Sequence, residues 1–415
     1  MDSLKIIGQS KLSGEVKISS AKNSSLPILI STLLTAQKVK LNNIPKLRDI
    51  NTTKKLLQNL GVKIEEINNQ IELDASDITS TEATYDLVKT MRASILVLGP
   101  LLARFGEAKV SLPGGCAIGD RPVDIHLENL EKLGASIELE KGYVVAKCKK
   151  LIGTTLHLSF PSVGATENLM MAACLADGET IIENAAMEPE IEDLAEFLNK
   201  LGAKISGAGS DKIVITGVKS LMGGEHTPIG DRIEAITYII CGLATKSEIK
   251  VSQFETKYIE STLELLRSMG AKLKIESDSV TTYPSIIKPI HVVTAPHPGF
   301  PTDAQAQLMA LMTITHGQST IVENIFENRF MHVSELNRLG ADITIEGKIA
   351  EIHGVESLDG APVMCTDLRA SAALVIAALV AKGETIISRV YHLDRGYEKI
   401  EEKLKALGAQ IERIS

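Results

Sequence analysis

One short phrase, Leu-Gly-Ala or a close variant, recurs six times along the 415 residues of the chain. Its glycines are Gly61, Gly134, Gly202, Gly270, Gly340 and Gly408, separated by 73, 68, 68, 70 and 68 residues. Chance does not produce six copies at so even a period, so the chain consists of six copies of one structural unit. Several units must share a core, because one unit alone cannot bury all its apolar faces.

Each phrase is typical of the end of a helix that is followed by a strand. In the third copy, Leu198 and Leu201 lie on one helical face just before Gly202. The glycine suits the left-handed conformation that commonly ends a helix. Residues 203–206 then alternate between apolar and polar, as strands do. The pattern therefore predicts a helix, a left-handed glycine and a strand at all six positions.

A second phrase marks another strand, placed after a helix rich in alanine and leucine. It reads Gly-Glu-Thr-Ile-Ile at 178–182 and 383–387, with a close variant at 317–322. Each unit is therefore predicted as strand, helix, strand, helix, strand, which makes an α/β fold. Two domains of three units are favoured over a continuous α/β solenoid, because solenoid repeats are usually shorter, about 20 to 50 residues.

The charge balance excludes several classes of binding protein. The chain has 44 Lys and Arg against 52 Asp and Glu, a net charge of −8, and its aromatic residues are seven Phe and seven Tyr. A nucleic-acid or anionic-membrane binder needs a basic face, and base stacking needs aromatic rings. We therefore expect no nucleic-acid partner.

The placement of apolar residues, cysteines and histidines bears on location and metals. Lys5 and Gly8 interrupt the N-terminal apolar segment, and the longest apolar stretch, 372–381, has ten residues, about half a membrane span. The five cysteines form no C-x-x-C pair, and the histidines form no H-E-x-x-H. We expect a cytoplasmic protein with no membrane insertion, no metal and no cofactor.

The first turns of the Ala/Leu-rich helices carry charge although the helix bodies are apolar. Four of these turns contain a cation: Lys22, Arg92, Arg232 and Arg369. A cation opposes the helix dipole, whereas the unpaired N–H groups at a helix start bind anions. A solvated side chain is enough to explain any one cation. Four at equivalent positions favour a site for a small, multiply charged anion such as a phosphate or a carboxylate.

Residues 112–124 contain three glycines and two prolines, which is typical of an exposed loop. Cys116 lies in this segment near Arg121, a setting that can lower the pKa of a thiol. The other four cysteines lie in or beside apolar patterns that suit buried, inert thiols. His126 is the one histidine close in sequence, so a Cys-His protease is weakly supported.

Together these segments resemble the enolpyruvyl transferase family over essentially the whole chain. The motifs that carry the resemblance are Lys22-Asn23, Pro113-Gly114-Gly115-Cys116, Arg121-Pro122-Val123-Asp124, Ser162-Val163-Gly164-Ala165-Thr166, Pro301-Thr302-Asp303, Glu327-Asn328-Arg329-Phe330 and Asp394-Arg395-Gly396-Tyr397. The resemblance implies two inside-out α/β barrel-like domains, each of three βαβαβ-type units with buried inner helices. It also implies two crossings between domains, so that residues 21–229 form the domain with the cysteine loop, and residues 1–20 and 230–415 form the other.

The resemblance further implies a bacterial enzyme of peptidoglycan synthesis. Such an enzyme transfers the enolpyruvyl group of phosphoenolpyruvate to the 3′-hydroxyl of UDP-N-acetylglucosamine and releases phosphate by addition and elimination. This is the first committed step of precursor synthesis and the target of fosfomycin. The resemblance implies no cofactor, and we expect a monomer.

The resemblance also assigns roles to residues of this sequence. Those implied for phosphoenolpyruvate are Lys22, Asn23, Arg92, Arg121, Arg329, Arg369 and Arg395. Those implied for the UDP-sugar are Asn23, Arg92, Arg121, Pro122, Val123, Asp124, Ile125, His126, Ser162, Val163, Gly164, Asp303 and Ile325. The implied catalytic residues are Cys116, Asp303, Lys22 and Arg395. Cys116 is either a proton donor or a covalent nucleophile, and Asp303 is a base near the 3′-hydroxyl, with a simple helix cap as its alternative role.

Two other functions stay open. A sister transferase that acts on shikimate 3-phosphate would share the repeats, but its site does not resemble the Pro-Gly-Gly-Cys loop. A catalytically silent relative that senses sugar nucleotide is disfavoured because Lys22, Cys116, Asp303 and Arg395 are all present. Phe160 and Pro161 stand where some relatives carry a basic residue, which puts one nucleotide contact in doubt.

Overall fold

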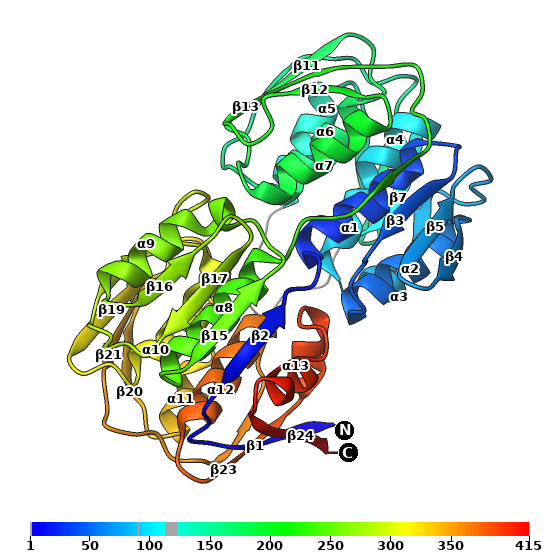
Figure 1. Cartoon of the computed structure of the whole chain (residues 1–415). Coiled ribbons are helices and arrows are strands. Elements are labelled where there is room, and N and C mark those ends of the chain that lie inside the picture. The colour runs from blue at the N-terminus through cyan, green and yellow to red at the C-terminus, as the bar shows by residue number, and fades with distance from the viewer. Residues whose placement is uncertain (1, 90, 113–122, 415) are drawn as a thin grey trace. The chain divides into compact units, whose positions relative to one another are not determined.

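The computed structural model describes residues 2–89, 91–112 and 123–414 (Figure 1). These residues divide into two compact units. The terminal unit comprises residues 2–19 and 230–414, and the central unit comprises residues 20–89, 91–112 and 123–229. The chain passes from one unit to the other after Ser19 and again after Ile229. Cys116, Arg121 and Pro122 of the predicted site lie outside the described residues.

Every sheet in the described part of the chain has four strands and the same topology. In one of them β10 (Thr155–His157) runs parallel to β11 (Glu179–Glu183). Antiparallel pairings then join β11 to β13 (Lys212–Thr216) and β13 to β12 (Lys204–Ser206). Each of the first five repeats thus carries one strand beyond the predicted pattern, because the strand after the glycine turns back as a hairpin. In the sixth repeat the strand after the glycine, β24 (Gln410–Ile414), pairs instead with β1 (Ser3–Ile7).

The other sheets follow the same plan. The central unit also contains β14 (Gly224–His226), β3 (Val39–Asn42), β5 (Gln70–Asp74) and β4 (Lys63–Ile67), and then β6 (Glu82–Ala83), β7 (Glu107–Ser111), β9 (Tyr143–Lys147) and β8 (Ser136–Glu140). The terminal unit contains β22 (Pro362–Met364), β23 (Glu384–Ser388), β1 (Ser3–Ile7) and β24 (Gln410–Ile414); β16 (Lys272–Ile275), β17 (Ser279–Tyr283), β15 (Glu248–Ser252) and β2 (Ser13–Lys17); and β18 (His291–Val293), β19 (Gln318–Val322), β21 (Ile349–His353) and β20 (Asp342–Glu346).

The helices rich in alanine and leucine are buried inside each unit, and the sheets lie outside them (Figure 1). They are α1 (Lys22–Ser31), α4 (Leu98–Phe105) and α6 (Val163–Ala173) in the central unit, and α8 (Arg232–Ala244), α10 (Gln305–Met312) and α12 (Leu368–Val380) in the terminal unit. In α12 every residue from Arg369 to Leu379 is buried. The predicted inside-out arrangement is therefore confirmed.

The second helix of each repeat is amphipathic and packs one face against the core. These helices are α2 (Arg48–Leu60), α5 (Asp124–Lys132), α7 (Pro189–Lys200), α9 (Glu260–Ser268), α11 (Val333–Arg338) and α13 (Ile400–Ala406). The six repeated glycines that follow have φ between 89° and 112°. The predicted left-handed position is thus confirmed in all six repeats, and each glycine leads into a strand. The remaining helical turns are α3 (Tyr85–Val88), η1 (Thr32–Leu34), η2 (Arg92–Val97), η3 (Thr256–Ile259), η4 (Thr302–Ala304) and η5 (Val390–Arg395).

The first and fourth repeats exchange the short strands that lead into their inner helices. Elsewhere the strand that leads into an inner helix pairs with the strand that follows that helix. β2 instead precedes α1 but pairs with β15 of the terminal unit, and β14 precedes α8 but pairs with β3 of the central unit. Each unit is therefore closed by a segment from another part of the chain. No helix among the described residues has the length and apolar character needed to cross a membrane.

Candidate active site

The described residues of the predicted site form one set in each unit, and each set includes residues at the first turns of the inner helices. In the central unit Lys22 begins α1, Arg92 begins the η2 turn that leads into α4, and Ser162 caps α6. In the terminal unit Asp303 lies in η4 just before α10, and Arg369 lies in the first turn of α12. Charge at helix starts is thus a feature of both units.

Lys22 contacts an acidic residue of the next helix. Its Nζ lies 3.4 Å from Asp49 Oδ2, and the two side chains are only 12% and 6% exposed. Among the described residues no side chain caps α1, and its first turn contains no acidic residue. The N–H groups at the start of α1, with Asn23 beside them, therefore suit an anion next to the Lys22 ammonium.

His126 is a buried, neutral ring whose hydrogen-bond partner fixes its tautomer. It lies in α5, which begins at Asp124 and Ile125 after Val123 at the N-cap. Asn168 Oδ1 accepts a hydrogen bond from the Gly99 amide at 2.7 Å, so its Nδ2 faces His126 Nδ1 at 3.0 Å. Nδ1 therefore accepts, and the ring proton sits on Nε2. Burial, and then the charge of Arg92, lower the pKa of His126 to about 4.

Two stretches predicted to hold the UDP-sugar meet at this ring. A Cβ placed on Gly164 would lie 3.5 and 3.6 Å from His126 Cε1 and Nε2. The first turn of α6, with Ser162 as its cap and Val163 following, therefore packs against the edge of His126 that carries the proton. The absence of a side chain at Gly164 lets the His126 ring approach the backbone of this helix start closely.

In the terminal unit Asp303 is bonded to two arginines. Arg329 Nη2 donates to Asp303 Oδ1 at 2.6 Å, and Arg369 Nη2 donates to Oδ2 at 3.0 Å. Both arginine side chains are almost fully buried, whereas that of Asp303 is 26% exposed. Charge-assisted bonds to both oxygens fix the orientation of the carboxylate.

The three charges depend on one another. Burial disfavours the charged form of Arg369, but Asp303, Tyr397 and Asp231 together outweigh burial and raise the pKa of the guanidinium. Pro301, not Asp303, stands at the N-cap of η4. The Asp303 carboxylate is thus directed to the arginines.

The last two predicted residues of this unit lie on neighbouring segments. Arg395 ends η5, and the adjacent Asp394 is held by Arg413 through bonds of 2.7 and 3.1 Å. Ile325 follows β19, and its amide donates to Glu323 Oε1 at 2.8 Å. The chain is therefore anchored next to Arg395 in one segment and at Ile325 itself in the other.

Two residues were missed from the sequence although they hold predicted ones in place. Asp49 pairs with Lys22, and Asn168 holds His126. Asn168 is a fully buried amide in a largely apolar helix, four residues after Gly164. A polar residue at such a position was the signal that could have identified it.

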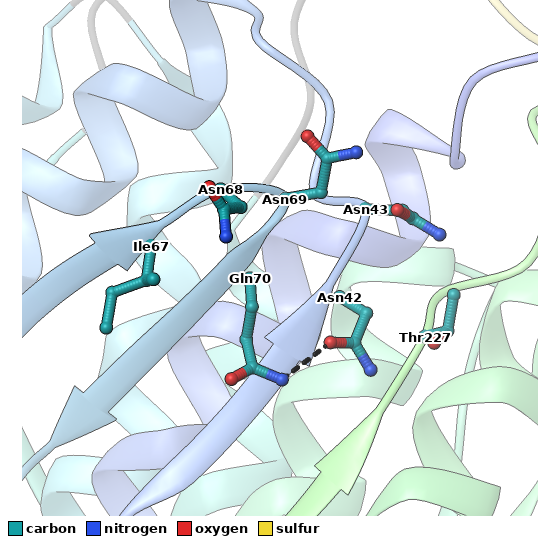
Figure 2. Close-up of a pocket in the computed structure, with 7 residues that line it drawn as sticks. All are labelled: Asn42, Asn43, Ile67, Asn68, Asn69, Gln70 and Thr227. Carbon is teal, nitrogen blue, oxygen red and sulfur yellow. Dashed lines mark hydrogen bonds between the residues drawn. The ribbon is translucent and has the colours of Figure 1, made fainter.

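A shallow pocket elsewhere in the central unit does not belong to this set (Figure 2). It measures about 470 Å³ and is lined by Asn42, Asn43, Ile67, Asn68, Asn69, Gln70 and Thr227. Gln70 Nε2 donates to Asn42 Oδ1 at 2.8 Å across it. Its lining is mostly amide side chains and carries no charged side chain, so the pocket does not suit a multiply charged anion. In the described part of the chain no group of three or more His, Cys, Asp or Glu could hold a metal ion.

Comparison with known proteins identifies the family. Residues 6–404 match the family described as EPSP synthase (3-phosphoshikimate 1-carboxyvinyltransferase). The chain is 55% identical, over the full length of both proteins, to the UDP-N-acetylglucosamine 1-carboxyvinyltransferase of Geobacter metallireducens, and 53% identical to that of Hydrogenovibrio crunogenus. The chain belongs to the enolpyruvyl transferase family.

Solved structures agree with the fold of an enolpyruvyl transferase. The enolpyruvyl transferase NikO from Streptomyces tendae is 26% identical, with a TM-score of 0.89 over 99% of this chain and 98% of that one. EPSP synthase from Acinetobacter baumannii is 19% identical, with a TM-score of 0.77 over the full length of both chains. The second likeness bears on the fold alone.

Proposed function

We propose that this enolpyruvyl transferase uses phosphoenolpyruvate as donor and the 3′-hydroxyl of UDP-N-acetylglucosamine as acceptor. Protonation at C3 of the donor and attack of the 3′-oxygen at C2 form a tetrahedral adduct. Breaking the C2–O bond to phosphate and removing a proton from C3 then restore the double bond. This is the first committed step of peptidoglycan precursor synthesis.

One observation carries the choice of acceptor. Relatives 53 to 55% identical over their full length are named for UDP-N-acetylglucosamine, although the family as a whole is described by shikimate 3-phosphate. The packing of His126 against Gly164 supports the choice, because it joins the two stretches expected to hold the sugar nucleotide. We also propose that the reaction takes place in the bacterial cytoplasm. The described cysteines, Cys148, Cys174, Cys241 and Cys365, are free thiols, as a reducing compartment requires.

The residues divide the work between binding and proton transfer. We assign Lys22, Arg121 and Arg395 to the phosphate and carboxylate of phosphoenolpyruvate, with Arg92, Arg329 and Arg369 in support. Asp303 is the base for the 3′-hydroxyl, and its partial exposure leaves room for a substrate hydroxyl. Cys116 is the proton donor or covalent nucleophile. Asn23 and the stretches around His126 and Ser162 hold the sugar nucleotide.

A phosphate-release assay with each substrate alone and with both tests the proposal. Release should require phosphoenolpyruvate together with UDP-N-acetylglucosamine, and shikimate 3-phosphate should not replace the sugar nucleotide. Asp303→Asn should lower kcat at least a hundredfold, because general-base catalysis contributes about 10²–10⁴. The control Asp342→Asn alters an exposed carboxylate of the same unit and should keep wild-type rates. Binding of the sugar nucleotide without turnover would contradict the proposal.

A further inference from the structure

A fully buried tyrosine lies behind the charged residues of the terminal unit. Tyr397 comes two residues after Arg395 and is 1% exposed. The Arg369 guanidinium carbon lies 5.8 Å from the centre of its ring, within the range of a cation–π contact. The phenol thus touches a residue that binds Asp303.

The hydroxyl of Tyr397 has a defined donor role. Its oxygen lies 2.8 Å from Thr237 Oγ1 on α8. Thr237 already donates its one hydrogen to the Ile233 carbonyl at 2.8 Å, so the phenol is the donor to Thr237. Burial raises the pKa of Tyr397 despite the opposing charge of Arg369, so the phenol keeps its proton.

Gln307 on α10 connects this hydroxyl to Asp303. Its Nε2 donates to the Asp303 carbonyl oxygen at 2.9 Å. Because that oxygen only accepts, the amide nitrogen must face it, which fixes the orientation of the Gln307 side chain. The second N–H is shared between the Tyr397 and Thr237 oxygens, each at 3.2 Å. The phenol therefore holds the amide that holds the main chain of Asp303.

We propose that Tyr397 is a positioning residue for enolpyruvyl transfer, acting on Asp303 through Gln307 and on Arg369 through its ring. Without the hydroxyl, one Gln307 N–H keeps only Thr237 as its acceptor, so the buried amide is held less firmly. The bond from Gln307 to the Asp303 carbonyl is then less constrained, while the Asp303 carboxylate still has to meet both arginines. Small displacements of a reacting group cost up to about a hundredfold in rate. The proposal rests on the proposed function, since Asp303 is the base assigned there.

Two buried tyrosines of the same unit give a matched pair of variants. Tyr238 on α8 is fully buried, and none of the described residues bonds to its hydroxyl. Tyr397→Phe and Tyr238→Phe each remove one oxygen and keep the ring. We expect Tyr397→Phe to lower kcat/KM about tenfold and Tyr238→Phe to leave it within twofold, with both proteins folded. Equal activity of the two variants would overturn the proposal.

A double-mutant cycle separates positioning from general weakening of the fold. If Tyr397 acts through Gln307, then Tyr397→Phe should cost little more in a Gln307→Leu protein, because the connection is already broken. Tyr238→Phe and Gln307→Leu should act independently. If the fold-losses in kcat/KM of the two single variants multiply in the double variant, the residues act independently and the proposal is contradicted. If Tyr397→Phe fails to fold, the Thr237 variants replace it. Thr237→Val should lower kcat/KM about tenfold, and Thr237→Ser should keep the wild-type value. A larger loss in Thr237→Ser than in Thr237→Val would overturn the proposal.

A readout without substrates distinguishes this proposal from the proposed function. If the wild-type protein releases no phosphate with both substrates, the proposed function fails and the positioning is tested by amide hydrogen exchange. Peptides covering residues 300–308 should exchange faster in Tyr397→Phe than in the wild type. In Tyr238→Phe the same peptides should exchange at the wild-type rate. Equal exchange in all three proteins would overturn the role of Tyr397 on its own.

Discussion

His126 is kept neutral by its surroundings, and this couples stability to pH. Its pKa of 6.5 in the unfolded chain falls to about 4 in the fold, through burial and then Arg92. Because the folded value is the lower one, the stability contributed by the neutral ring is fully present above pH 6.5. It is lost as the pH falls through 4.

We predict that His126→Gln flattens the pH dependence of unfolding between pH 4 and 6.5. The pKa shift corresponds to a loss of about 3 kcal/mol in the free energy of unfolding at the acid end of this range. Unfolding of the wild type should take up as much as about one proton more than unfolding of the variant. Urea unfolding at a series of pH values measures this. His157→Gln is the control, because that side chain is 72% exposed. Parallel curves for the wild type and His126→Gln would contradict the prediction.

Cys116 has a chemical test that does not depend on its placement. We predict that Cys116→Ser abolishes both turnover and labelling by fosfomycin, because a thiolate attacks the epoxide and a serine hydroxyl does not. Intact-mass spectrometry detects the adduct. Cys148→Ser, at a free and half-buried thiol, should label and turn over as the wild type does. A labelled Cys116→Ser protein would contradict the assigned role.

The sequence predicted the charged residues better than it predicted their partners. Lys22 and Arg369 could be found because they sit at helix starts, a local pattern. Asp49 and Asn168 could not, because their pairings join positions 27 and 42 residues apart and arise only when the helices pack. Local sequence patterns show which residues lie at a helix start, whereas the packing of the helices determines which residues they contact.

At the scale of elements, the repeated glycine was predictable and the hairpin after it was not. Lys141 and Gly142 join β8 to β9 as a two-residue turn in which both have positive φ. Apolar and polar residues alternate on both sides of such a tight turn, so two strands look like one long strand. The extra strand of this repeat is hidden in this way.

Replacing one of the repeated glycines should measure the cost of its backbone conformation. Gly340 has φ of 89°, and a Cβ there would meet nothing within 4 Å. We predict that Gly340→Ala lowers the free energy of unfolding by about 1 kcal/mol and that Gly340→Asn costs less, because Asn tolerates the left-handed region. Chemical denaturation ranks the two. An alanine variant as stable as the wild type would contradict the argument.

At the scale of the molecule, the repeats predicted two groups of three but not the exchange of short strands. A three-residue strand such as β14 has too few residues to show an alternating pattern. Its partner β3 lies more than a hundred residues away, so only the assembled sheet reveals the pairing. Closure of each unit is therefore a property of the whole chain.

The first and last described strands are paired, which permits a circular permutant. Ser3 and Ile414 are paired residues of β1 and β24. We predict that joining them with a short linker and opening the chain at Ile286, which is 87% exposed between β17 and β18, keeps fold and activity. Opening at the buried Thr385 within β23 should prevent folding. Circular dichroism and the phosphate-release assay compare the two, and the opposite ranking would contradict the prediction.

The position of β1 has a consequence for synthesis on the ribosome. β1 is among the first segments made, but both of its partners, β23 and β24, are among the last. All described residues of the central unit lie between 20 and 229, so that unit can form its sheets while the terminal unit is still being translated. β1 has neither of its partner strands until β23 and β24 have been translated. An unpaired strand invites pairing with other chains, and the short length of β1, with Lys5 at its centre, limits that hazard until its partners emerge.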